Sequence, residues 1–456
     1  MPLRAAISHS GRSIRRRTDR HWQNLFACGE PARGQSPMEQ IPTAMRLNSQ
    51  EQAMLAGESG QAAQLALQLQ IKVGDFFGAE DMVPVRSAHL AADAESLRDF
   101  GVQYLRSIAD RDGRFKIPTT INAGAADPDR PGVIGQRRVW HSRTRDINAA
   151  LDAMGAHMCL TCVNYQLLDQ PHLGEHLAWG DTGTVIWANS ICGARSNFEA
   201  GPAALCAGIT GRTPRYGMHL DVNRRAEVLV RVSARPRGRG QWSALGGLVG
   251  RELNDYWRVP CFVGDFGSPS PDELKFFGAA LASFGSTPMF HWVGLTPEAP
   301  SLEAAFGSAS PKRTLDVDDA AIAGFMREFT PDSDAADVVA FSAPQLSPQE
   351  IADLAARFRG RRVSDRVLCL ATTSPMARLE AERLGHAGTL AGSGVELIAG
   401  TCFYVMAPHE LVSSRGFRTI VTDSAKLANI ISGYGYQPAL RGTDDCVDAA
   451  ITGKIP

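Results

Sequence analysis

The chain has 456 residues, and its 47 Lys and Arg residues almost balance its 48 Asp and Glu residues. A net charge of −1 gives no electrostatic reason to bind nucleic acid or an anionic membrane. With 44% hydrophobic and 21% charged residues, the composition is typical of a soluble globular protein of two or three domains. Nine cysteines spread over this length do not form the dense pattern of a secreted disulfide scaffold. We therefore expect a reducing, cytoplasmic location in which some thiols are free to bind metal.

Residues 1–44 differ in composition from the rest of the chain. They contain seven arginines but three acidic residues, and they lack the apolar run of a secretory signal. An Arg-rich, acid-poor segment is also typical of mitochondrial transit peptides. The composition favours a disordered extension, or translated sequence upstream of a true start at Met45.

From Met45 the pattern indicates folded structure. Residues Leu47–Ile71 form a Gln-, Ala- and Leu-rich stretch that predicts a helix, and two later runs, Gly183–Ala188 and Glu227–Val232, resemble strands. Ser270-Pro-Asp-Glu273 is a capping box with proline at the first helical position, so it predicts the start of a helix. The Pro-rich stretch 296–312 indicates a domain boundary. We expect one region over residues 45–310, helical at first and then α/β, and a C-terminal α/β domain over 311–456.

Strands and helices alternate clearly in the last third of the chain, which indicates a parallel α/β sheet. The expected strands are Val338–Phe341, Val367–Ala371, Val395–Ile398 and Thr419–Val421. The expected helices are one from a capping box at Ser347 to Gly360, one over Pro375–Leu384, and one capped near Asp423. Ligands bind beyond the carboxyl ends of such strands. The polar residues expected there are Ser342, Thr372, Thr373, Ser374, Thr401, Cys402, Asp423, Ser424 and Lys426.

Two motifs suggest metal binding. Cys159-Leu-Thr-Cys162 lacks the second pair that a zinc ribbon needs, but one of its thiols could bind iron together with a thiol distant in sequence. His172-Leu-Gly-Glu175-His176 matches the H-x-x-E-H motif of zinc peptidases, which requires a helix. The Pro before this motif and the Gly within it argue against a helix. A zinc peptidase nevertheless stays an alternative.

The segment Asn189–Asn197 is dense in amide, hydroxyl and guanidinium donors. It follows a run that resembles a strand, and a donor-rich loop with one arginine, Arg195, suits a carboxylate ligand because the guanidinium fork matches its two oxygens. The alternative is a loop whose polar groups hydrogen-bond one another. The chain has no Walker-type, G-x-G-x-x-G or G-x-S-x-G motif.

Together these segments resemble the aconitase X family, a branch of the aconitase superfamily of iron–sulfur hydro-lyases. The segments that carry the resemblance occur in the family's order from about Met45 to the end. They are Thr161–Tyr165, Gly174–Trp179, Ala188–Asn197, Leu274–Ala280, His291–Ala299, Gly400–Cys402 and Asp423–Lys426. The resemblance implies a multi-domain, aconitase-like α/β/α fold with parallel sheets, and it is to the family's large, catalytic subunit.

The resemblance also implies a set of site residues. Family members hold an iron–sulfur cluster through thiols that match Cys162 and Cys402. A third family cysteine stands in a Gly-Cys-Pro-His context, where this chain has Ser342-Ala-Pro-Gln345, so we expect Ser342 to replace that ligand. We expect the substrate to be bound by Thr119, Thr120, Asn189, Ser190, Arg195, Ser196, Asn197, Ser424 and Lys426.

Bacterial family members that resemble this chain are cis-3-hydroxy-L-proline dehydratases, whereas archaeal members with the third cysteine are mevalonate 5-phosphate dehydratases. The missing cysteine favours the first reaction, which yields Δ1-pyrroline-2-carboxylate. The family's general base belongs to a small swivelling domain for which this chain has no room. We therefore expect a separate small subunit, joined in a hetero-oligomer, and no general base in this chain. A non-catalytic subunit is the remaining alternative.

Overall fold

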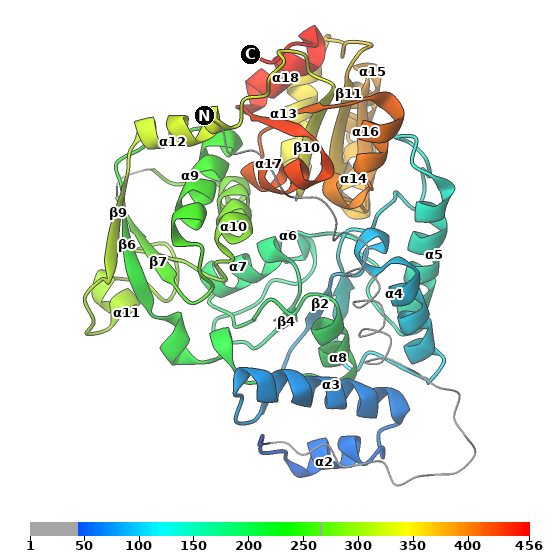
Figure 1. Ribbon diagram of the computed structural model, residues 1–456, viewed down its shortest axis with the longest axis vertical. Helices are drawn as coiled ribbons and strands as arrows, with labels where there is room; N and C mark the ends of the chain where they lie inside the picture. Colours follow the sequence, from blue (N-terminus) through cyan, green and yellow to red (C-terminus); the bar gives the residue numbers. More distant parts are fainter. Residues whose placement is uncertain (1–43, 265–266) are drawn as a thin grey trace, which may run out of the picture. The chain divides into compact units, whose positions relative to one another are not determined.

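The computed structural model describes residues 44–264 and 267–456 (Figure 1). The extension predicted for residues 1–44 therefore lies, except for Ala44, outside the described residues. Across those residues no helix combines the length and the apolar character needed to cross a membrane. Three sheets consist entirely of parallel strands, which confirms the expected α/β class.

The first part of the described chain combines helices with a small parallel sheet in the order β3-β2-β4 and an antiparallel pair, β1-β5. The helix predicted over Leu47–Ile71 is two helices, because Gly57 and Gly60 between them take φ values near +90°. The elements are α2 (Ser49–Leu55), α3 (Gln61–Phe77), β1 (Met82–Pro84), β2 (Ala88–Leu90), α4 (Ala94–Ala109), β3 (Thr119–Ile121), α5 (Arg138–Ala153), α6 (Asn164–Leu167), β4 (Ala178–Trp179), α7 (Thr182–Ser190), α8 (Pro202–Thr210), β5 (Arg212–Pro214), η1 (Gly217–His219) and η2 (Asp221–Arg224).

The strand predicted over Gly183–Ala188 is wrong, because these residues belong to helix α7. The Asp181 carboxylate accepts a hydrogen bond from the Gly183 N–H at 2.8 Å and so caps the helix. Nearly every side chain of α7 is buried. A short apolar run that is buried on all sides has the same pattern in a helix as in a buried strand, so periodicity could not distinguish them.

The second part contains a parallel sheet in the order β8-β7-β6-β9, covered by α9 and α10. The predicted helix start at Ser270 is confirmed, since both hydrogen bonds of its capping box are present. Helices α9 and α10 pack closely, because a Cβ at Gly246 would lie 2.1 Å from the Phe277 carbonyl oxygen. The elements are β6 (Ala226–Val232), α9 (Gly238–Leu253), β7 (Val259–Val263), α10 (Pro271–Gly285), β8 (His291–Trp292), α11 (Leu302–Phe306), β9 (Arg313–Val317) and α12 (Asp319–Glu328).

Sheet membership changes after α12. Strand β9 lies beyond the boundary predicted at residue 310 but pairs with β6, so it belongs to the second sheet. The division into 45–310 and 311–456 stays a prediction at the level of domains. The sheets themselves change between α12 and β10 (Val338–Leu346).

The last part is a five-stranded parallel sheet in the order β12-β11-β10-β13-β14. All four predicted strands and the capping box at Ser347 are confirmed. The last of the predicted helices, α17, is capped by Ser424 rather than by Asp423. Strand β14 and helix α18 were not predicted. The elements that follow β10 are α13 (Pro348–Phe358), β11 (Leu368–Thr373), α14 (Pro375–Arg383), α15 (His386–Gly392), β12 (Val395–Ala399), η3 (Phe403–Val405), α16 (His409–Arg415), β13 (Thr419–Thr422), α17 (Ala425–Ile431), η4 (Ser432–Tyr434), β14 (Gln437–Leu440) and α18 (Thr443–Thr452).

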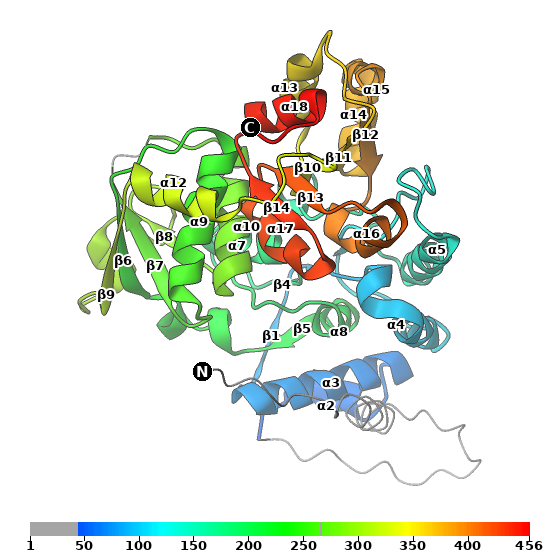
Figure 2. The ribbon, with the colours of Figure 1, turned by 45° about the horizontal axis from the view of Figure 1, so that its top comes forward.

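Helices cover both faces of this last sheet, as Figure 2 shows for α18 on one side and α17 on the other. Phe358 of α13 and Val447 of α18 pack in one apolar cluster with Val339 of β10. Leu427 of α17 packs with Val338 in another cluster. Because neighbouring residues of a strand point to opposite faces, these two clusters lie on the two sides of β10. The arrangement is a three-layer α/β/α domain whose central strand is completely buried.

Candidate active site

A cavity of about 510 Å³ opens beyond the carboxyl ends of strands from the first and third parallel sheets. Helix α10 of the second part of the chain forms another side of it. This is the edge where sheet topology predicts a ligand site. The lining residues are Ala91, Asp93, Ser96, Asn122, Ala123, Cys162, Gly180, Asp181, Thr182, Phe198, Ala200, Ala282, Ser283, Ser286, Ala343, Cys402, Tyr404, Val405, Lys426, Asn429 and Ile430.

Two thiols line this cavity, as the sequence predicts. Cys162 lies just before α6, and Cys402 follows β12 after Gly400, whose φ of +68° turns the chain. Both side chains are buried, and burial raises the pKa of Cys162 to about 12 and that of Cys402 above its ordinary value. The free thiols are therefore protonated at neutral pH. A bound metal would supply the positive charge that favours the thiolates.

Gln345, on strand β10, joins the two segments that carry these thiols. Its side-chain Nε2 donates to the Leu160 carbonyl at 3.2 Å and to the Thr401 carbonyl at 2.9 Å. Its backbone N–H donates to Cys162 Sγ at 3.3 Å. The whole residue is buried. One amide side chain therefore helps to determine how Cys162 and Cys402 lie relative to each other.

Ser342, which we predicted as a metal ligand, is already hydrogen-bonded to neighbouring groups. Its Oγ lies 2.7 Å from Thr372 Oγ1 and 3.4 Å from Cys402 Sγ, and it accepts a hydrogen bond from the Phe403 N–H at 3.0 Å. The neighbouring residue Ala343, rather than Ser342, is among the described residues that line the cavity. The hydroxyl supports Cys402 in this geometry, and its role as a ligand stays a prediction.

Lys426 brings a buried cation to the same cavity. Its Nζ donates to Thr182 Oγ1 at 2.7 Å and lies 3.6 Å from Asp181 Oδ1. Burial disfavours the ammonium, but the pKa of Lys426 is raised, with the charge of Asp181 and its hydrogen bond to the ammonium favouring the protonated form. Lys426 is therefore positioned and charged to bind an anionic group of a ligand.

Ser424 lies at the N-terminus of α17, where its hydrogen bonds have a structural role. Its Oγ donates to the Ala343 carbonyl and accepts from the Leu427 N–H at 3.1 Å, which makes it the helix cap. It therefore attaches α17, with Lys426, to strand β10.

The polar groups of Asn189–Asn197 mostly hydrogen-bond one another and the backbone. Asn189 Nδ2 donates to the Ser196 carbonyl at 2.8 Å, and Asn189 Oδ1 accepts from the Ser196 N–H at 2.9 Å. Ser190 Oγ accepts from the Phe290 N–H at 2.8 Å, and Asn197 Oδ1 accepts from the Met218 N–H at 2.9 Å. This pattern is that of a hydrogen-bonded structural segment, the alternative that residue types left open.

Arg195, Thr119 and Thr120 also lie outside the set of described residues that line the cavity. Arg195 donates to the His219 carbonyl at 3.1 Å and forms an ion pair with Asp221. Thr119 Oγ1 donates to the Ile117 carbonyl at 3.0 Å, while Thr120 Oγ1 donates to the Ala88 carbonyl at 3.3 Å. Their roles in binding substrate stay predictions. Of the predicted substrate-binding residues, the structure brings Lys426 alone to the cavity wall within the described chain.

The H-x-x-E-H segment does not form the helix that a zinc peptidase needs. Residues 171–180 are turns, an isolated bridge and strand β4. His172 is mostly exposed, and His176 faces His219, with 2.9 Å between the two Nδ1 atoms. The two histidines of the motif therefore do not lie one helical turn apart on a shared face.

Several residues that line the cavity are not among those predicted from the sequence. Asp93 and Asp181 both follow a short strand and cap the next helix, and Asp181 Oδ1 accepts from Asn122 Nδ2 at 3.4 Å. Burial raises the pKa of Tyr404 far above its ordinary value, so its phenol keeps its proton. An aspartate between a strand and a helix was the available signal for the two carboxylates. The strands before them have two or three residues each, too few to show a pattern.

The donors at this site suit an iron–sulfur centre. Soft thiolates are the ligands that such centres prefer, and Cys162 and Cys402 offer two of them at one buried cavity. The neighbouring Lys426 ammonium offsets part of the negative charge that thiolates bring. Over residues 44–264 and 267–456, no cluster of three or more His, Cys, Asp or Glu side chains is arranged to bind a metal ion. An iron–sulfur centre bound at this cavity would have two thiolates available to it, those of Cys162 and Cys402.

Family models match nearly the whole described chain. Residues 44–222 match the model described as the aconitase X first domain, residues 226–327 match the second domain, and residues 336–452 match the third domain.

Curated proteins and a solved structure are also similar. A cis-3-hydroxy-L-proline dehydratase of Pseudomonas aeruginosa is 35% identical over 92% of this chain and 73% of its own length. A phosphomevalonate dehydratase large subunit of Methanothermobacter thermautotrophicus is 34% identical over 85% of this chain and 94% of its own length. The crystal structure of Thermococcus kodakaraensis aconitase X in its holo-form has a TM-score of 0.80 at 29% identity, and covers 89% of this chain and 100% of its own.

Proposed function

Because this chain belongs to the aconitase X family, whose curated members are dehydratases, we propose that it converts cis-3-hydroxy-L-proline to Δ1-pyrroline-2-carboxylate. The proposed reaction is that of a hydro-lyase, a carbon–oxygen lyase. It removes the proton from the carbon that bears the carboxylate and expels the hydroxyl group from the next carbon. The enamine product then tautomerises to the cyclic imine.

The charge of the cavity carries this choice of substrate. Lys426 is the single cationic side chain among the described residues that line the cavity, and Asp93 and Asp181 bring two carboxyl groups. A zwitterionic amino acid has one group for each: its carboxylate suits the ammonium of Lys426, and its own ammonium suits the carboxylates. A volume of about 510 Å³ is ample for such a ligand.

Mevalonate 5-phosphate is the alternative substrate within the family. It carries a carboxylate and a phosphate, and a cavity with one cation and two carboxyl groups offers no second positive partner among its described residues. Since phosphates are usually bound by several cationic or N–H donors, this charge pattern favours the amino acid.

The side chains of this chain bind and orient the substrate. Lys426 Nζ is held by Thr182 and Asp181, so its side chain is already ordered before the substrate binds. It therefore loses little conformational entropy when it pairs with the substrate carboxylate. Neutralising that carboxylate also makes the adjacent C–H more acidic, because the negative charge that develops there is stabilised. The burial of Lys426 and both thiols excludes water and strengthens these interactions.

We assign an iron–sulfur centre to Cys162 and Cys402, and we propose Ser342 as the third ligand. When bound, such a centre acts as a Lewis acid that makes the substrate hydroxyl a better leaving group, a contribution of several kcal/mol. Gln345 and Ser342 hold the two thiols in place through the hydrogen bonds described above.

The general base is assigned to a separate small subunit with a swivelling domain. Lys426 keeps its proton, Tyr404 is a phenol, and Asp181 is bonded to the Gly183 N–H and faces Lys426, so none of these three is suited to accept the substrate proton. A well-placed base contributes about 10²- to 10⁴-fold in rate. The name of the archaeal relative, a large subunit, implies a partner for that protein and supports the assignment here.

The first test is metal analysis of the full chain purified without oxygen. We expect iron with acid-labile sulfide and a visible absorption band, and we expect Cys402→Ser to lose both. Cys192→Ser changes a half-buried thiol outside the cavity and serves as the matched control. Zinc without sulfide, or an unchanged spectrum in Cys402→Ser, would contradict the assignment.

The second test compares substrates in the presence of the partner subunit. We expect turnover of cis-3-hydroxy-L-proline and none of mevalonate 5-phosphate; the reverse preference would overturn the substrate assignment. Full activity of this chain alone, with its metal centre intact, would show that no partner supplies the base.

A further inference from the structure

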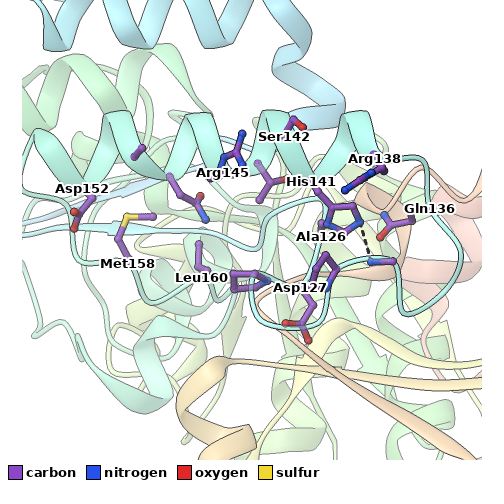
Figure 3. A pocket seen from close by; sticks show the side chains of 16 residues that line it. Ala126, Asp127, Gln136, Arg138, His141, Ser142, Arg145, Asp152, Met158 and Leu160 are labelled. Atoms are coloured by element: carbon purple, nitrogen blue, oxygen red, sulfur yellow. Dashed lines mark hydrogen bonds between the residues drawn. The ribbon is translucent and has the colours of Figure 1, made fainter.

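A second cavity of about 880 Å³ lies along helix α5, and it shares none of its described lining residues with the cavity of Cys162 and Cys402 (Figure 3). One wall is a stripe of α5 that includes Arg138, His141 and Arg145, three and four residues apart and therefore on one face of the helix. The opposite wall is the segment 126–136. We propose that this α5 groove is a binding site for a small organic anion.

Charge is the first argument for an anionic ligand. Arg138 and Arg145 are exposed, and within the described part of the chain Arg145 has a single weak ion pair, 3.9 Å from Asp146. Asp127, on the opposite wall, is neutralised by Arg378 at 3.0 Å and also accepts from the Ala399 N–H. Asp152 lies seven residues beyond Arg145, about two helical turns away. Arg138 and Arg145 are themselves seven residues apart, so the groove has two guanidinium groups spaced along α5, each of which suits the oxygens of a carboxylate or phosphate.

Two buried polar atoms without partners are the second, independent argument. Gln136 is 8% exposed; its Nε2 donates to the Ala125 and Met406 carbonyls, both at 2.7 Å, but its Oε1 has no partner. Thr144 is 5% exposed and its Oγ1 has no partner. Both residues line the groove. Buried polar atoms are rarely left unpaired in folded proteins, so a ligand that reached this wall of the groove would find two groups available for hydrogen bonding.

His141 supplies a further donor. Its Nε2 accepts a hydrogen bond from the Gly132 N–H at 2.9 Å, drawn as a dashed line in Figure 3. A neutral imidazole that accepts at Nε2 carries its proton at Nδ1, so that N–H is a donor. The groove thus combines cationic and neutral donors with acceptors that include Gln136 Oε1.

The remaining wall indicates the body of the ligand. Pro128, Met158 and Leu160 give the groove an apolar side. We therefore assign the ligand to organic anions of metabolite size, with a carboxylate or phosphate at one end, an apolar body, and a hydroxyl or N–H group for Gln136 Oε1.

The groove lies close to the two segments that carry the thiols. The Leu160 carbonyl is bound by Gln345, and Leu160 precedes Cys162 by two residues. Thr144 is next to Gly124, whose N–H donates to the Gly400 carbonyl at 2.8 Å, just before Cys402. A ligand in the α5 groove would therefore lie close to both segments that carry the thiols while occupying a separate cavity.

The test measures binding of two probes, inorganic phosphate and citrate, by calorimetry and by thermal melting at constant ionic strength. The full chain is used as purified. We expect saturable binding of at least one probe in the wild type, and a loss of ten-fold or more in affinity in the double variant Arg138→Gln/Arg145→Gln. Arg359→Gln/Arg362→Gln makes the same change of net charge at two exposed arginines outside the groove, and should bind like the wild type.

The outcomes distinguish the two chemistries and can refute the proposal. Binding of phosphate alone assigns a phosphate ester, binding of citrate alone assigns a carboxylate, and binding of both shows recognition of charge. No saturable binding of either probe at millimolar concentrations, or equal losses in both double variants, would overturn the proposal. Because the readout is binding and not turnover, failure here would leave the proposed reaction untouched.

Thr144→Val provides a second criterion that folding defects cannot imitate. Replacing an unpaired buried hydroxyl by a methyl group should leave the melting temperature of the free protein unchanged or higher. The stabilisation by the probe should fall at the same time. A Thr144→Val protein that binds the probes as tightly as the wild type would show that the buried hydroxyl does not face a ligand.

Discussion

Replacing Gln345 by leucine should loosen the contact between the segment that carries Cys162 and the segment that carries Cys402. It changes none of the described residues that line the cavity. The substitution keeps a side chain of similar size but removes the amide that donates to the Leu160 and Thr401 carbonyls. The backbone N–H that donates to Cys162 Sγ remains. The expected consequence is looser positioning of Cys162 relative to Cys402 and weaker retention of the metal centre.

The size of the effect follows from the two lost hydrogen bonds. Each contributes about 0.5–1.5 kcal/mol, and a buried carbonyl left without a partner costs about 1–3 kcal/mol. Gln345 Oε1 is itself unpaired in the native protein, so removing it returns part of this cost. We expect a net loss of about 2–4 kcal/mol in stability, or a fall of roughly 2–5 °C in the melting temperature of a chain of this length.

A short series of variants makes the prediction specific. Gln345→Glu, which is protonated when buried, keeps one O–H donor for two carbonyls and should lie between the wild type and Gln345→Leu. Gln349→Leu is the control, because Gln349 is exposed and its amide bonds only Asp353 on the same helix, so its effect should stay within about 0.5 kcal/mol.

Melting temperature, iron per chain and the visible spectrum are measured together for each variant. The reasoning predicts that iron content and melting temperature fall in the order wild type, Gln345→Glu, Gln345→Leu. If Gln345→Leu melts and retains iron like the Gln349→Leu control, the amide does not hold the thiol segments and the argument is wrong.

Three further predictions follow from buried ionisable groups. Lys426→Met should lower kcat/KM by about 10- to 100-fold, mainly through KM, while iron content stays near that of the wild type; unchanged kinetics would exclude Lys426 as the carboxylate ligand. Burial lowers the pKa of His89 to about 4, so the unfolded chain binds a proton below pH 6.5 that the folded protein excludes. Stability present above pH 6.5 should therefore be lost as the pH falls towards 4, by up to about 3 kcal/mol, and melting curves of His89→Asn should show a weaker dependence over that range. Lys275→Met removes the buried partner of Glu350 and should destabilise the protein by about 3–5 kcal/mol in denaturation experiments. The loss is smaller if Arg239, which also pairs with Glu350, compensates. A neutral effect would show that the pair of Lys275 and Glu350 contributes little to stability.

The sequence alone determined the elements whose signals are local. The capping boxes at Ser270 and Ser347 mark their helices correctly, because each cap is made by residues only three positions apart. The alternation of strands and helices after β10 identified a parallel sheet. That topology was enough to place Cys402 and Lys426 at a ligand-binding edge.

Tertiary structure decided which distant segments meet at that edge. Cys162 reaches the cavity through Gln345, and Lys426 through Asp181 and Thr182, and no local pattern records such contacts. The same limit explains why the sequence pattern of α7 is misleading and why the role of Arg195 stays a prediction. Helix α7 resembles a strand in the sequence, because burial on all sides removes the periodic signal. Arg195 has the chemistry of a carboxylate ligand, but its guanidinium is engaged by Asp221 and the His219 carbonyl. Residue type and spacing fix what a side chain can do, whereas its direction and its partners depend on packing between segments that lie far apart in the chain.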